Sequence, residues 1–459
     1  MDSPRGRNLF DDSLIAALRH VADRSNTTAA LPNEAYTDAR TLAAEADAVL
    51  RRAWIGIAFE ADVPGPGTVF PVDLTDTPLL LVRDRAGAVR VFHNVCRHRG
   101  MKLVVEPGRT GRVIRCPYHS WCYRLDGSLD RTPHVGGVGH DTHPDLDPTK
   151  LGLIEVRSAV WFGTVFVDLS GKAPAFDAAM SGLQARWSAF GGADFRSGGG
   201  DSTFDMVLNA NWKLAVENYL ESYHLPSVHP ALNSYSRIED HELLVGDDGF
   251  AGQISLVYRP VLDVEGLGFP KVAGLSEYWE TRGEYIALYP NLLLGLHSDH
   301  WFTILLLPDG PERTQERIRI GYFSDDAATG VDHAALREAN TRLWQVVFGE
   351  DIAPVERMQA GRHSPAFDGG VLTPVLETTT RDFHAWMADR LHRSSVPKSA
   401  GSIWPASTMT GSRHSGRHFW ITACCSSGIR TSASTPTRRS VAGLVTCTFI
   451  RPPTTTTTG

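Results

Sequence analysis

Two short segments of the sequence, each holding one cysteine and one histidine, constrain the fold more than any other feature. The first is Cys96-x-His98 and the second is Cys116-x2-His119, with residues 99–115 between them. Each segment offers one thiolate and one imidazole from a short turn, so the two turns can close on one metal centre. A [2Fe–2S] cluster bound by two cysteines on one iron and two histidines on the other needs this set of ligands.

A structural zinc site is the alternative, because two cysteines and two histidines also suit tetrahedral zinc. Zinc ligands are usually spaced as a cysteine pair and a histidine pair, whereas here each segment is mixed. The mixed spacing therefore favours the iron–sulfur cluster. Histidine ligands would raise its reduction potential above that of an all-cysteine cluster.

The motif and its flanks resemble the large (alpha) subunits of Rieske non-haem iron oxygenases, and the resemblance extends from about residue 31 to about residue 390. The flanking residues that carry it are Asn94, Arg99, Gly100, Trp121, Tyr123 and Gly127. The resemblance implies an α+β protein in two parts. An N-terminal all-β domain would hold the Rieske [2Fe–2S] cluster, and a C-terminal α+β catalytic domain would have an antiparallel sheet covered by helices.

Length and composition exclude several other classes. A chain of 459 residues is long enough for two or three domains, and 42% hydrophobic and 21% charged residues are ordinary for a globular protein. The net charge of −7 gives no basic surface for nucleic acid, and no apolar run is long enough to span a membrane. Six cysteines suggest no disulfide framework, and the first residues lack the apolar core of a signal peptide. We expect a cytoplasmic protein.

The pattern along the chain predicts five segments. Residues 1–54 carry helical periodicity, and residues 55–170 form short β-type runs separated by glycine, proline and aspartate. Residues 171–200 hold a connecting helix and a glycine-rich linker, and residues 201–393 combine strands and helices as the catalytic domain. Residues 394–459 contain no aspartate or glutamate, which indicates a disordered tail or, alternatively, one translated out of frame.

Three more local patterns give testable expectations. The region from Thr37 to Trp54 predicts one helix, and the hydrophobic run from Ala159 to Val167 predicts one strand. Pro354 is expected to kink or restart the helix that contains it.

A second pair of histidines suggests a second metal centre. His224 and His229 follow the segment Glu217-Asn218 and flank Pro226, so a helix end that turns into a loop can direct both at one point. Non-haem iron(II) oxygenases bind iron with two histidines and one carboxylate on one face, leaving the other face open. We predict that His224 and His229 are iron ligands. A structural or surface role is the alternative.

The third ligand is implied only by the resemblance. Residues 350–361 resemble the acidic motif near the C-terminal end of the family's catalytic domain, and the aspartate ligand of that motif corresponds to Asp351. Glu350 and Glu356 stay open as alternative ligands, and a solvated helix face is the ordinary role for any of the three.

Glu221 stands three residues before His224 and has an implied role between the two centres. In the family this position is usually aspartate. It accepts a hydrogen bond from an iron-ligating histidine and another from a cluster histidine of the neighbouring subunit. The resemblance implies that Glu221 connects His224 to His119 of the partner subunit, in a homotrimer. Glutamate occurs here in a minority of the family, including some members that act on quaternary ammonium compounds; a capping or surface role is the alternative.

The two centres together imply an oxygenase that uses O2 and electrons from NAD(P)H. The chain lacks a glycine-rich dinucleotide fingerprint, so a separate flavin and iron–sulfur reductase or a ferredoxin would supply the electrons. Residues 217–229, 289–291 and 297–301 resemble the choline- and betaine-oxidising branch. We therefore expect hydroxylation or N-demethylation of a small quaternary or methylated ammonium compound, or of a similar polar substrate. Candidates for an aromatic cage around the ammonium are Tyr223, Tyr258, Tyr285, Tyr289 and Trp301.

Three other functions stay open from the sequence. The first is a ring-hydroxylating oxygenase that acts on an aromatic acid or hydrocarbon. The second is a Rieske electron carrier without oxygenase activity, which would not need His224, His229 and Asp351. The third is a binding protein stabilised by zinc.

Overall fold

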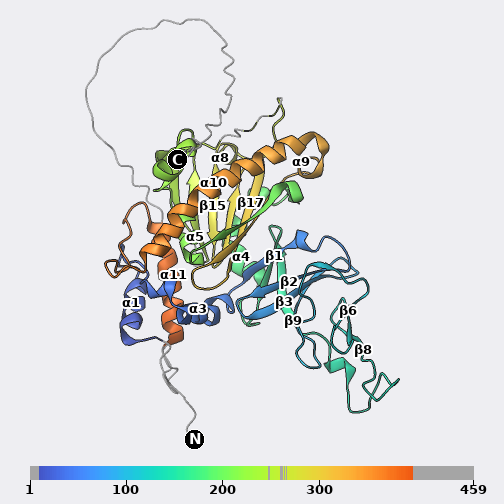
Figure 1. Ribbon diagram of the computed structural model, residues 1–459. Helices are drawn as coiled ribbons and strands as arrows, with labels where there is room; N and C mark the ends of the chain where they lie inside the picture. The colour runs from blue at the N-terminus through green and yellow to red at the C-terminus, as the bar shows by residue number, and fades with distance from the viewer. Residues whose placement is uncertain (1–9, 247–248, 259–261, 263, 265, 396–459) are drawn as a thin grey trace, which may run out of the picture. The chain divides into compact units, whose positions relative to one another are not determined.

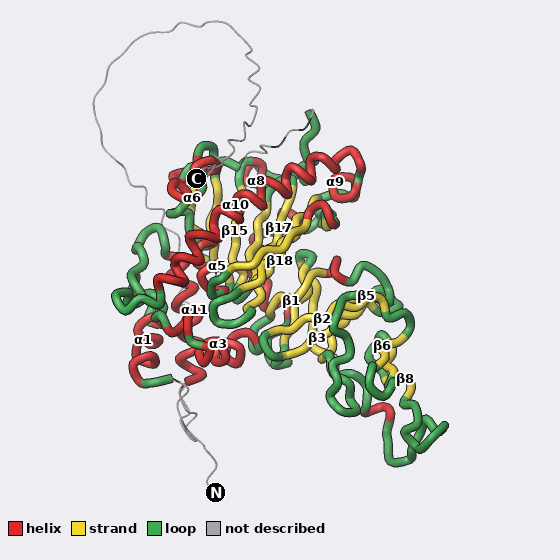
Figure 2. Tube along the Cα trace, in the orientation of Figure 1, coloured by secondary structure: helices red, strands yellow, loops and turns green. Residues whose placement is uncertain are grey.

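The computed structural model describes residues 10–246, 249–258, 262, 264 and 266–395. Residues 396–459, which hold nearly all of the predicted tail, lie outside the described residues. The described chain contains an all-antiparallel β region and a larger region of sheet and helices (Figures 1 and 2). This arrangement confirms the predicted α+β fold class. Among the helices of these residues, none is both long and apolar enough to cross a membrane.

The N-terminal segment forms helices, as expected, but not one helix from Thr37 to Trp54. The elements are α1 (Asp12–Ala22), α2 (Glu34–Thr37), α3 (Ala39–Glu45) and a π-helical turn (Ala46–Leu50). Asp38 causes the break, because its backbone is extended and its side chain accepts a hydrogen bond from the backbone N–H of Arg40. Aspartate in this position starts a new helix rather than continuing the previous one.

The β region consists of one seven-stranded sheet and one three-stranded sheet, both antiparallel. The small sheet carries the second Cys/His segment between two of its strands, and the first segment follows a strand of the large sheet. In spatial order the large sheet contains β1 (Ile55–Phe59), β10 (Thr164–Asp168), β9 (Glu155–Trp161), β4 (Val89–His93), β3 (Thr77–Arg83), β2 (Thr68–Leu74) and β5 (Gly108–Arg109), and the small sheet contains β6 (Val113–Arg115), β7 (Cys122–Arg124) and β8 (Leu129–Arg131).

The single strand expected from Ala159 to Val167 is wrong. The chain turns at Phe162 and Gly163, so that β9 and β10 pair as a hairpin. Both turn residues have positive φ, 52° and 66°, as a tight two-residue hairpin turn requires. Gly163 is the only sequence signal for this turn, because a phenylalanine with positive φ is uncommon and the run is apolar on both sides.

The connecting segment holds α4 (Phe176–Arg186) and a 3-10 turn (Ser188–Phe190). The guanidinium of Arg186 donates to both carboxylate oxygens of Glu284, at 2.8 and 2.7 Å, and the Glu284 side chain is fully buried. This bidentate pair fixes α4 against the sheet of the larger region.

The larger region is built on an eight-stranded antiparallel sheet. Strand β18 pairs with three others, because β12 and β11 lie in succession along the edge that β17 leaves free. In spatial order the main path contains β11 (Arg196–Ser197), β18 (Thr314–Tyr322), β17 (His300–Pro308), β16 (Leu292–Leu296), β15 (Gly283–Leu288), β14 (Phe250–Ser255) and β13 (His241–Val245), and β12 (Thr203–Leu208) lies off this path.

Helices cover this sheet, and the longest of them crosses it obliquely (Figure 1). That helix, α10 (Ala334–Gly361), has 28 residues and does not restart at Pro354. The other helices are α5 (Trp212–Tyr219), α6 (Leu225–Val228), α7 (Pro230–Asn233), α8 (Glu277–Glu280), α9 (Asp325–Thr329) and α11 (Thr378–Ser395).

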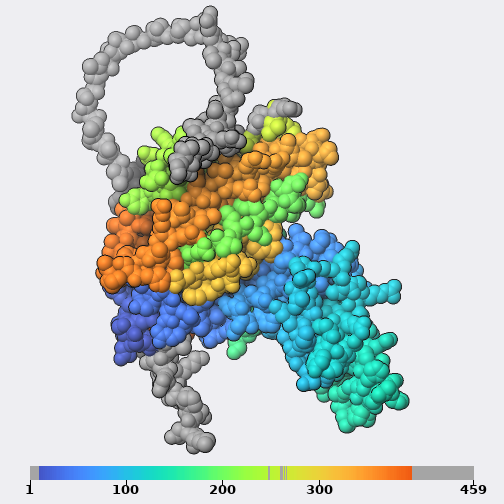
Figure 3. Space-filling model, in the orientation of Figure 1, coloured from blue at the N-terminus to red at the C-terminus, as the bar shows by residue number. Residues whose placement is uncertain are grey.

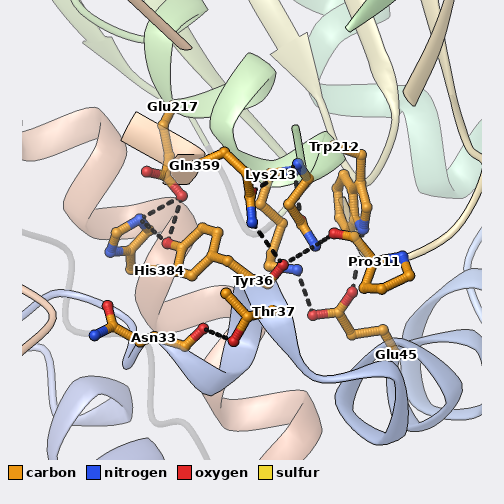
Figure 4. Close-up of polar contacts among 11 residues, drawn as sticks. Asn33, Tyr36, Thr37, Glu45, Trp212, Lys213, Glu217, Pro311, Gln359 and His384 are labelled. Carbon is orange, nitrogen blue, oxygen red and sulfur yellow. Dashed lines mark hydrogen bonds and ion pairs between the residues drawn. The ribbon is translucent and has the colours of Figure 1, made fainter. Parts of the chain in front are cut away.

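A cluster of buried charges joins the N-terminal helices to the helices of the larger region (Figure 4). The ammonium of Lys213, in α5, lies 2.5 Å from the carboxylate of Glu45, in α3, and both side chains are fully buried. The hydroxyl of Tyr36 donates to Glu217 at 2.6 Å, and His384, in α11, lies 3.0 Å from the same carboxylate. Burial lowers the pKa of Lys213 and raises that of Glu45, so each charge depends on its partner.

The N-terminal segment therefore packs on the helices of the larger region, and it also shares one hydrophobic core with the seven-stranded sheet of the β region. In Figure 3 the blue N-terminal residues lie directly against the orange residues of α11. Helix α5, which leads to His224 and His229, is thus held against the N-terminal helices by charged as well as apolar contacts.

Candidate metal centres

The two Cys/His segments have the same backbone geometry. In each, the N–H of the cysteine donates to the carbonyl five residues later, at 2.8 Å. Its carbonyl accepts from the N–H four residues later, at 3.1 Å. The residues that close the two turns, Gly100 and Ser120, both have positive φ. Two matching loops of this kind present one thiol and one imidazole each.

The side chains of the two loops are divided by burial. Cys96 and Cys116 are each 2% exposed, whereas His98 is exposed and His119 is partly exposed. The imidazole rings lie together, with centroids 4.7 Å apart, and His98 stacks on Trp121. The two thiols are therefore buried and the two imidazoles are more exposed. A cluster with one iron bound by cysteines and the other bound by histidines needs this separation.

The geometry also separates the cluster from the zinc alternative. Among the described residues, a single group has three metal-ligating atoms within 4.8 Å of one another, and this group does not include the cysteines and histidines of the two loops. Four ligands of a single tetrahedral zinc would be gathered at least as closely. The ligands of the two loops fit two metal ions instead.

The compact group consists of His224, His229 and Asp351. His224 immediately precedes the short helix α6 and His229 immediately follows it, so Pro226 lies in the first turn of a helix and not in the predicted loop. Asp351 comes from α10, 122 residues beyond His229. The Nε2 atoms of the two histidines lie 3.6 and 3.0 Å from the same oxygen, Oδ1 of Asp351. All three side chains therefore point to one place.

A carboxylate behind each histidine sets the direction of its ring. Nδ1 of His224 lies 2.7 Å from Glu221, and Nδ1 of His229 lies 2.7 Å from Glu350. Each Nδ1–H donates to its carboxylate and each Nε2 points toward Asp351, so both Nε2 atoms are placed to bind one metal ion. Two imidazoles and one carboxylate are the donor set of a non-haem iron(II) site.

These contacts distinguish the three acidic residues considered for the third ligand. Glu350 lies behind His229 and does not share the point where the Nε2 atoms meet. Glu356 accepts hydrogen bonds from the backbone and side chain of Asn209, at 2.9 and 2.8 Å. Asp351 alone faces both histidines, and the amide of Asn218 donates to it at 3.2 Å.

Two adjoining cavities open beside this group, between α10 and the sheet. The inner one, which we call the iron-side cavity, is lined by His224, His229 and Asp351. The other, which we call the distal cavity, is lined by Tyr258, Asp299 and His300. The residues that line both cavities are Leu232, Ser236, Tyr285, Trp344 and Val347.

Only part of the predicted aromatic cage lies at these cavities. Tyr258 and Tyr285 line the distal cavity. Tyr289 instead packs on Phe383 and Trp386, Trp301 packs on Phe162, and Tyr223 is 51% exposed and lines neither cavity. For these three the cage expectation is wrong. Trp301 lies in β17, where consecutive positions face opposite sides of the sheet, whereas Tyr289 and Tyr223 lie in loops whose direction the sequence does not indicate.

Trp344 and Tyr235 line the distal cavity and were missed. A signal for Trp344 was present, because it lies seven residues before Asp351 in the same helix. Residues seven apart share a helix face, so a tryptophan there points to the same side as the carboxylate.

Comparison with known protein families agrees with both centres. Residues 53–142 match the Rieske [2Fe-2S] domain, and residues 195–393 match the catalytic domain of the ring-hydroxylating alpha subunit. The chain belongs to the Rieske non-haem iron oxygenases. The predicted family, enzyme class and pair of cofactors, a Rieske [2Fe–2S] cluster and a mononuclear iron, are thereby confirmed.

This Rieske oxygenase is similar over most of its length to characterised enzymes. The glycine betaine monooxygenase oxygenase subunit of Chromohalobacter salexigens is 27% identical over 419 residues, which is 83% of this chain and 91% of that protein. The chloroplastic choline monooxygenase of Atriplex hortensis is 24% identical over 363 residues, 78% of this chain and 76% of that protein.

Solved structures share the fold. The quaternary ammonium Rieske monooxygenase CntA in complex with L-carnitine superposes with a TM-score of 0.64 at 22% identity, covering 81% of this chain and 97% of that one. Naphthalene 1,2-dioxygenase from Rhodococcus sp. also gives a TM-score of 0.64, at 19% identity, covering 83% and 99%. The fold is therefore common to enzymes whose substrates differ, and the substrate must be argued from the cavity.

Proposed function

We propose that this Rieske oxygenase hydroxylates or N-demethylates a small quaternary or methylated ammonium compound. The observation that carries the proposal is the distal cavity, which combines aromatic side chains with a buried carboxylate and adjoins the group of His224, His229 and Asp351. Aromatic faces and a carboxylate attract a methylated cation that water hydrates only weakly. The names of the relatives, which include glycine betaine and choline monooxygenases, support the same substrate class.

In this proposal each centre has a defined set of residues. The Rieske cluster is bound by Cys96, His98, Cys116 and His119. The mononuclear iron is bound by His224, His229 and Asp351. When bound, the cluster supplies single electrons and the iron supplies the activation of dioxygen.

The protein's own residues orient and enclose the reaction. Glu221 and Glu350 hold the Nδ1 protons of His224 and His229, which keeps each Nε2 available as a ligand. Leu232, Trp344 and Val347 line the passage between the two cavities and exclude water around the substrate.

Several wider features stay proposals. We propose that Glu221 connects His224 to His119 of the partner subunit in a cyclic homotrimer; a related quaternary ammonium monooxygenase is described as showing inter-subunit electron transfer. We also propose a separate NAD(P)H-dependent reductase or ferredoxin and a cytoplasmic location. The domain boundaries proposed are 1–54, 55–170, 171–200, 201–393 and a tail from 394.

A substrate screen tests the function. The purified protein, with a surrogate reductase, is offered choline, glycine betaine, carnitine and simple methylamines, and benzoate and naphthalene as aromatic controls. We expect a methylammonium compound to stimulate NADH and O2 consumption and to yield a product that contains one atom of ¹⁸O or lacks one methyl group, measured by mass spectrometry. Coupled oxidation of only the aromatic compounds would replace the proposal by ring hydroxylation.

Replacing Glu221 tests the proposed connection between the centres. We expect Glu221→Ala to keep both metal centres but to slow reoxidation of the reduced cluster by at least about 100-fold, because the bonded route to His224 is lost. Stopped-flow absorbance measures that rate, and iron and sulfide analysis verifies the metal content. Normal reoxidation in a fully loaded variant would show that electrons take another route.

A further inference from the structure

Asp299 lies in the turn before β17 and lines the distal cavity, where it is 3% exposed. The hydroxyl of Tyr258 donates to its Oδ1 at 2.9 Å, and Nδ1 of His300 lies 2.9 Å from the same oxygen. The carboxylate is thus held in place by two side-chain donors that also line the cavity.

The protonation of His300 follows from a third contact. The indole N–H of Trp344 donates to Nε2 of His300 at 3.0 Å. An indole nitrogen can only donate, so Nε2 must accept and carries no proton. His300 is therefore the neutral tautomer with its proton on Nδ1, and it gives Asp299 a hydrogen bond but no positive charge.

Asp299 has no cationic partner among the residues that the structure describes. It forms no ion pair with arginine or lysine in that part of the chain, and neither cavity has an arginine or lysine in its lining there. Burial raises the pKa of Asp299, whereas the hydrogen bonds that it accepts from His300 and Tyr258 lower the pKa and so favour the charged carboxylate. Burial also lowers the pKa values of His297 and His241, so these imidazoles add no charge.

A buried carboxylate without a cation is costly unless a ligand completes the pair. We propose that Asp299 is the residue that selects the charge of the substrate: the distal cavity binds an ammonium group on a molecule that is otherwise uncharged, such as an amino alcohol of the choline type. A zwitterion with a carboxylate, such as glycine betaine, is disfavoured, because its anionic end is repelled by Asp299 and meets no lysine or arginine among the described residues that line the two cavities. This inference rests on the proposed function and narrows its substrate class.

Binding measurements on the iron- and cluster-loaded enzyme test the inference without turnover. Anaerobic calorimetry compares three ligands of similar size: choline, its uncharged isostere 3,3-dimethyl-1-butanol, and glycine betaine. We expect the wild type to bind choline at least about tenfold more tightly than either of the others. Equal affinity for choline and glycine betaine in the wild type would overturn the inference, whatever any variant does.

The variant Asp299→Asn keeps the size of the side chain and removes its charge. We expect the preference for choline over the uncharged isostere to fall by about tenfold or more, and glycine betaine to approach choline in affinity. Asp332→Asn, the same change at an exposed position next to α10, should leave all three affinities unchanged.

The outcomes separate this inference from the proposed function. If Asp299→Asn keeps the wild-type preference for choline, Asp299 does not select charge, although methylammonium oxidation would stand. If the wild type binds neither choline nor glycine betaine and oxidises no methylammonium compound, the proposed function fails and the inference fails with it.

Discussion

The two metal centres of this Rieske oxygenase are built in opposite ways. The residues proposed to hold the cluster lie in two loops within residues 96–119, and neutral groups support them: backbone hydrogen bonds and the hydroxyl of Tyr123, 3.2 Å from the sulfur of Cys96. The residues proposed to hold the mononuclear iron lie at the two ends of α6 and in α10, with His229 and Asp351 122 residues apart, and carboxylates support the two histidines. In the cluster loops His98 is exposed and His119 is partly exposed, whereas His229 of the mononuclear site is only 2% exposed.

The difference reflects what each centre must do. A cluster that receives and passes single electrons benefits from accessible imidazoles and from neutral donors that tune its potential. A centre that binds dioxygen beside a substrate needs a cavity and a ligand set fixed in direction by hydrogen bonds behind it. Helix α5 is in turn held by a buried ion pair that has no counterpart at the cluster loops.

The largest expected effect is the loss of the mononuclear iron while the cluster is retained. Asp351→Ala removes the carboxylate that faces both histidines, so we expect iron to fall from about three to about two atoms per chain. The Rieske absorption and electron paramagnetic resonance signals should persist, and substrate oxidation should fall by at least about 1,000-fold, since an essential metal is absent. Iron and sulfide analysis checks the loss.

Glu350→Gln is the matched control for that variant. It keeps the donor set and changes only the group behind His229, so iron affinity should fall by about 10–100-fold without being abolished. Loss of the cluster signal in Asp351→Ala would contradict the independence of the two centres.

A second comparison concerns the ion pairs near each centre. Lys213→Met leaves the carboxylate of Glu45 buried without its partner, and we expect the free energy of unfolding to fall by about 3–5 kcal/mol. The pair of Lys102 and Asp73, beside the first cluster loop, is largely exposed. Lys102→Met should therefore cost less than about 1 kcal/mol.

Urea unfolding measures both variants, and the double variant Glu45→Leu/Lys213→Met should recover most of the lost stability. Equal effects of the two lysine substitutions would show that the buried pair gives α5 no special support.

The smallest expected effect lies at the cluster. The hydroxyl of Tyr123 lies at the sulfur of Cys96 and accepts from the backbone N–H of Arg97 at 2.9 Å. On a cluster-bound thiolate the hydroxyl must donate, which stabilises the reduced cluster. Tyr123→Phe should lower the reduction potential by on the order of tens of millivolts, since a hydrogen bond contributes about 1 kcal/mol. Redox titration followed by circular dichroism measures the change, and an unchanged potential would argue against the bond.

Much of the fold and of the two sites could be predicted from the sequence. The features that could not be predicted are those that depend on residues far apart along the chain. The two cysteine–histidine segments, the pair His224 and His229 and the sheet-and-helix class were all readable, because each depends on residues close together in sequence. The hairpin turn at Phe162 and Gly163 was not predicted, because a single glycine inside an apolar run does not distinguish a turn from a bulge in one strand.

The third acidic residue shows the same limit. Asp351, Glu350 and Glu356 lie within seven positions of one another, and only resemblance favoured one of them. The packing of α10 against α5 and α6 distinguished them, because it turned Asp351 toward both imidazoles and Glu350 behind one of them.

By itself, then, the sequence predicted two sets of metal-ligating residues, since cysteines and histidines at these short spacings are typical of metal sites. Only the tertiary structure decided what surrounds them: which aromatic residues line the cavity, and that Asp299 lies there without a lysine or arginine partner in the described part of the chain. The physical reason is that a cavity and an unpaired charge are properties of side chains brought together from distant strands and helices, and no local pattern encodes them.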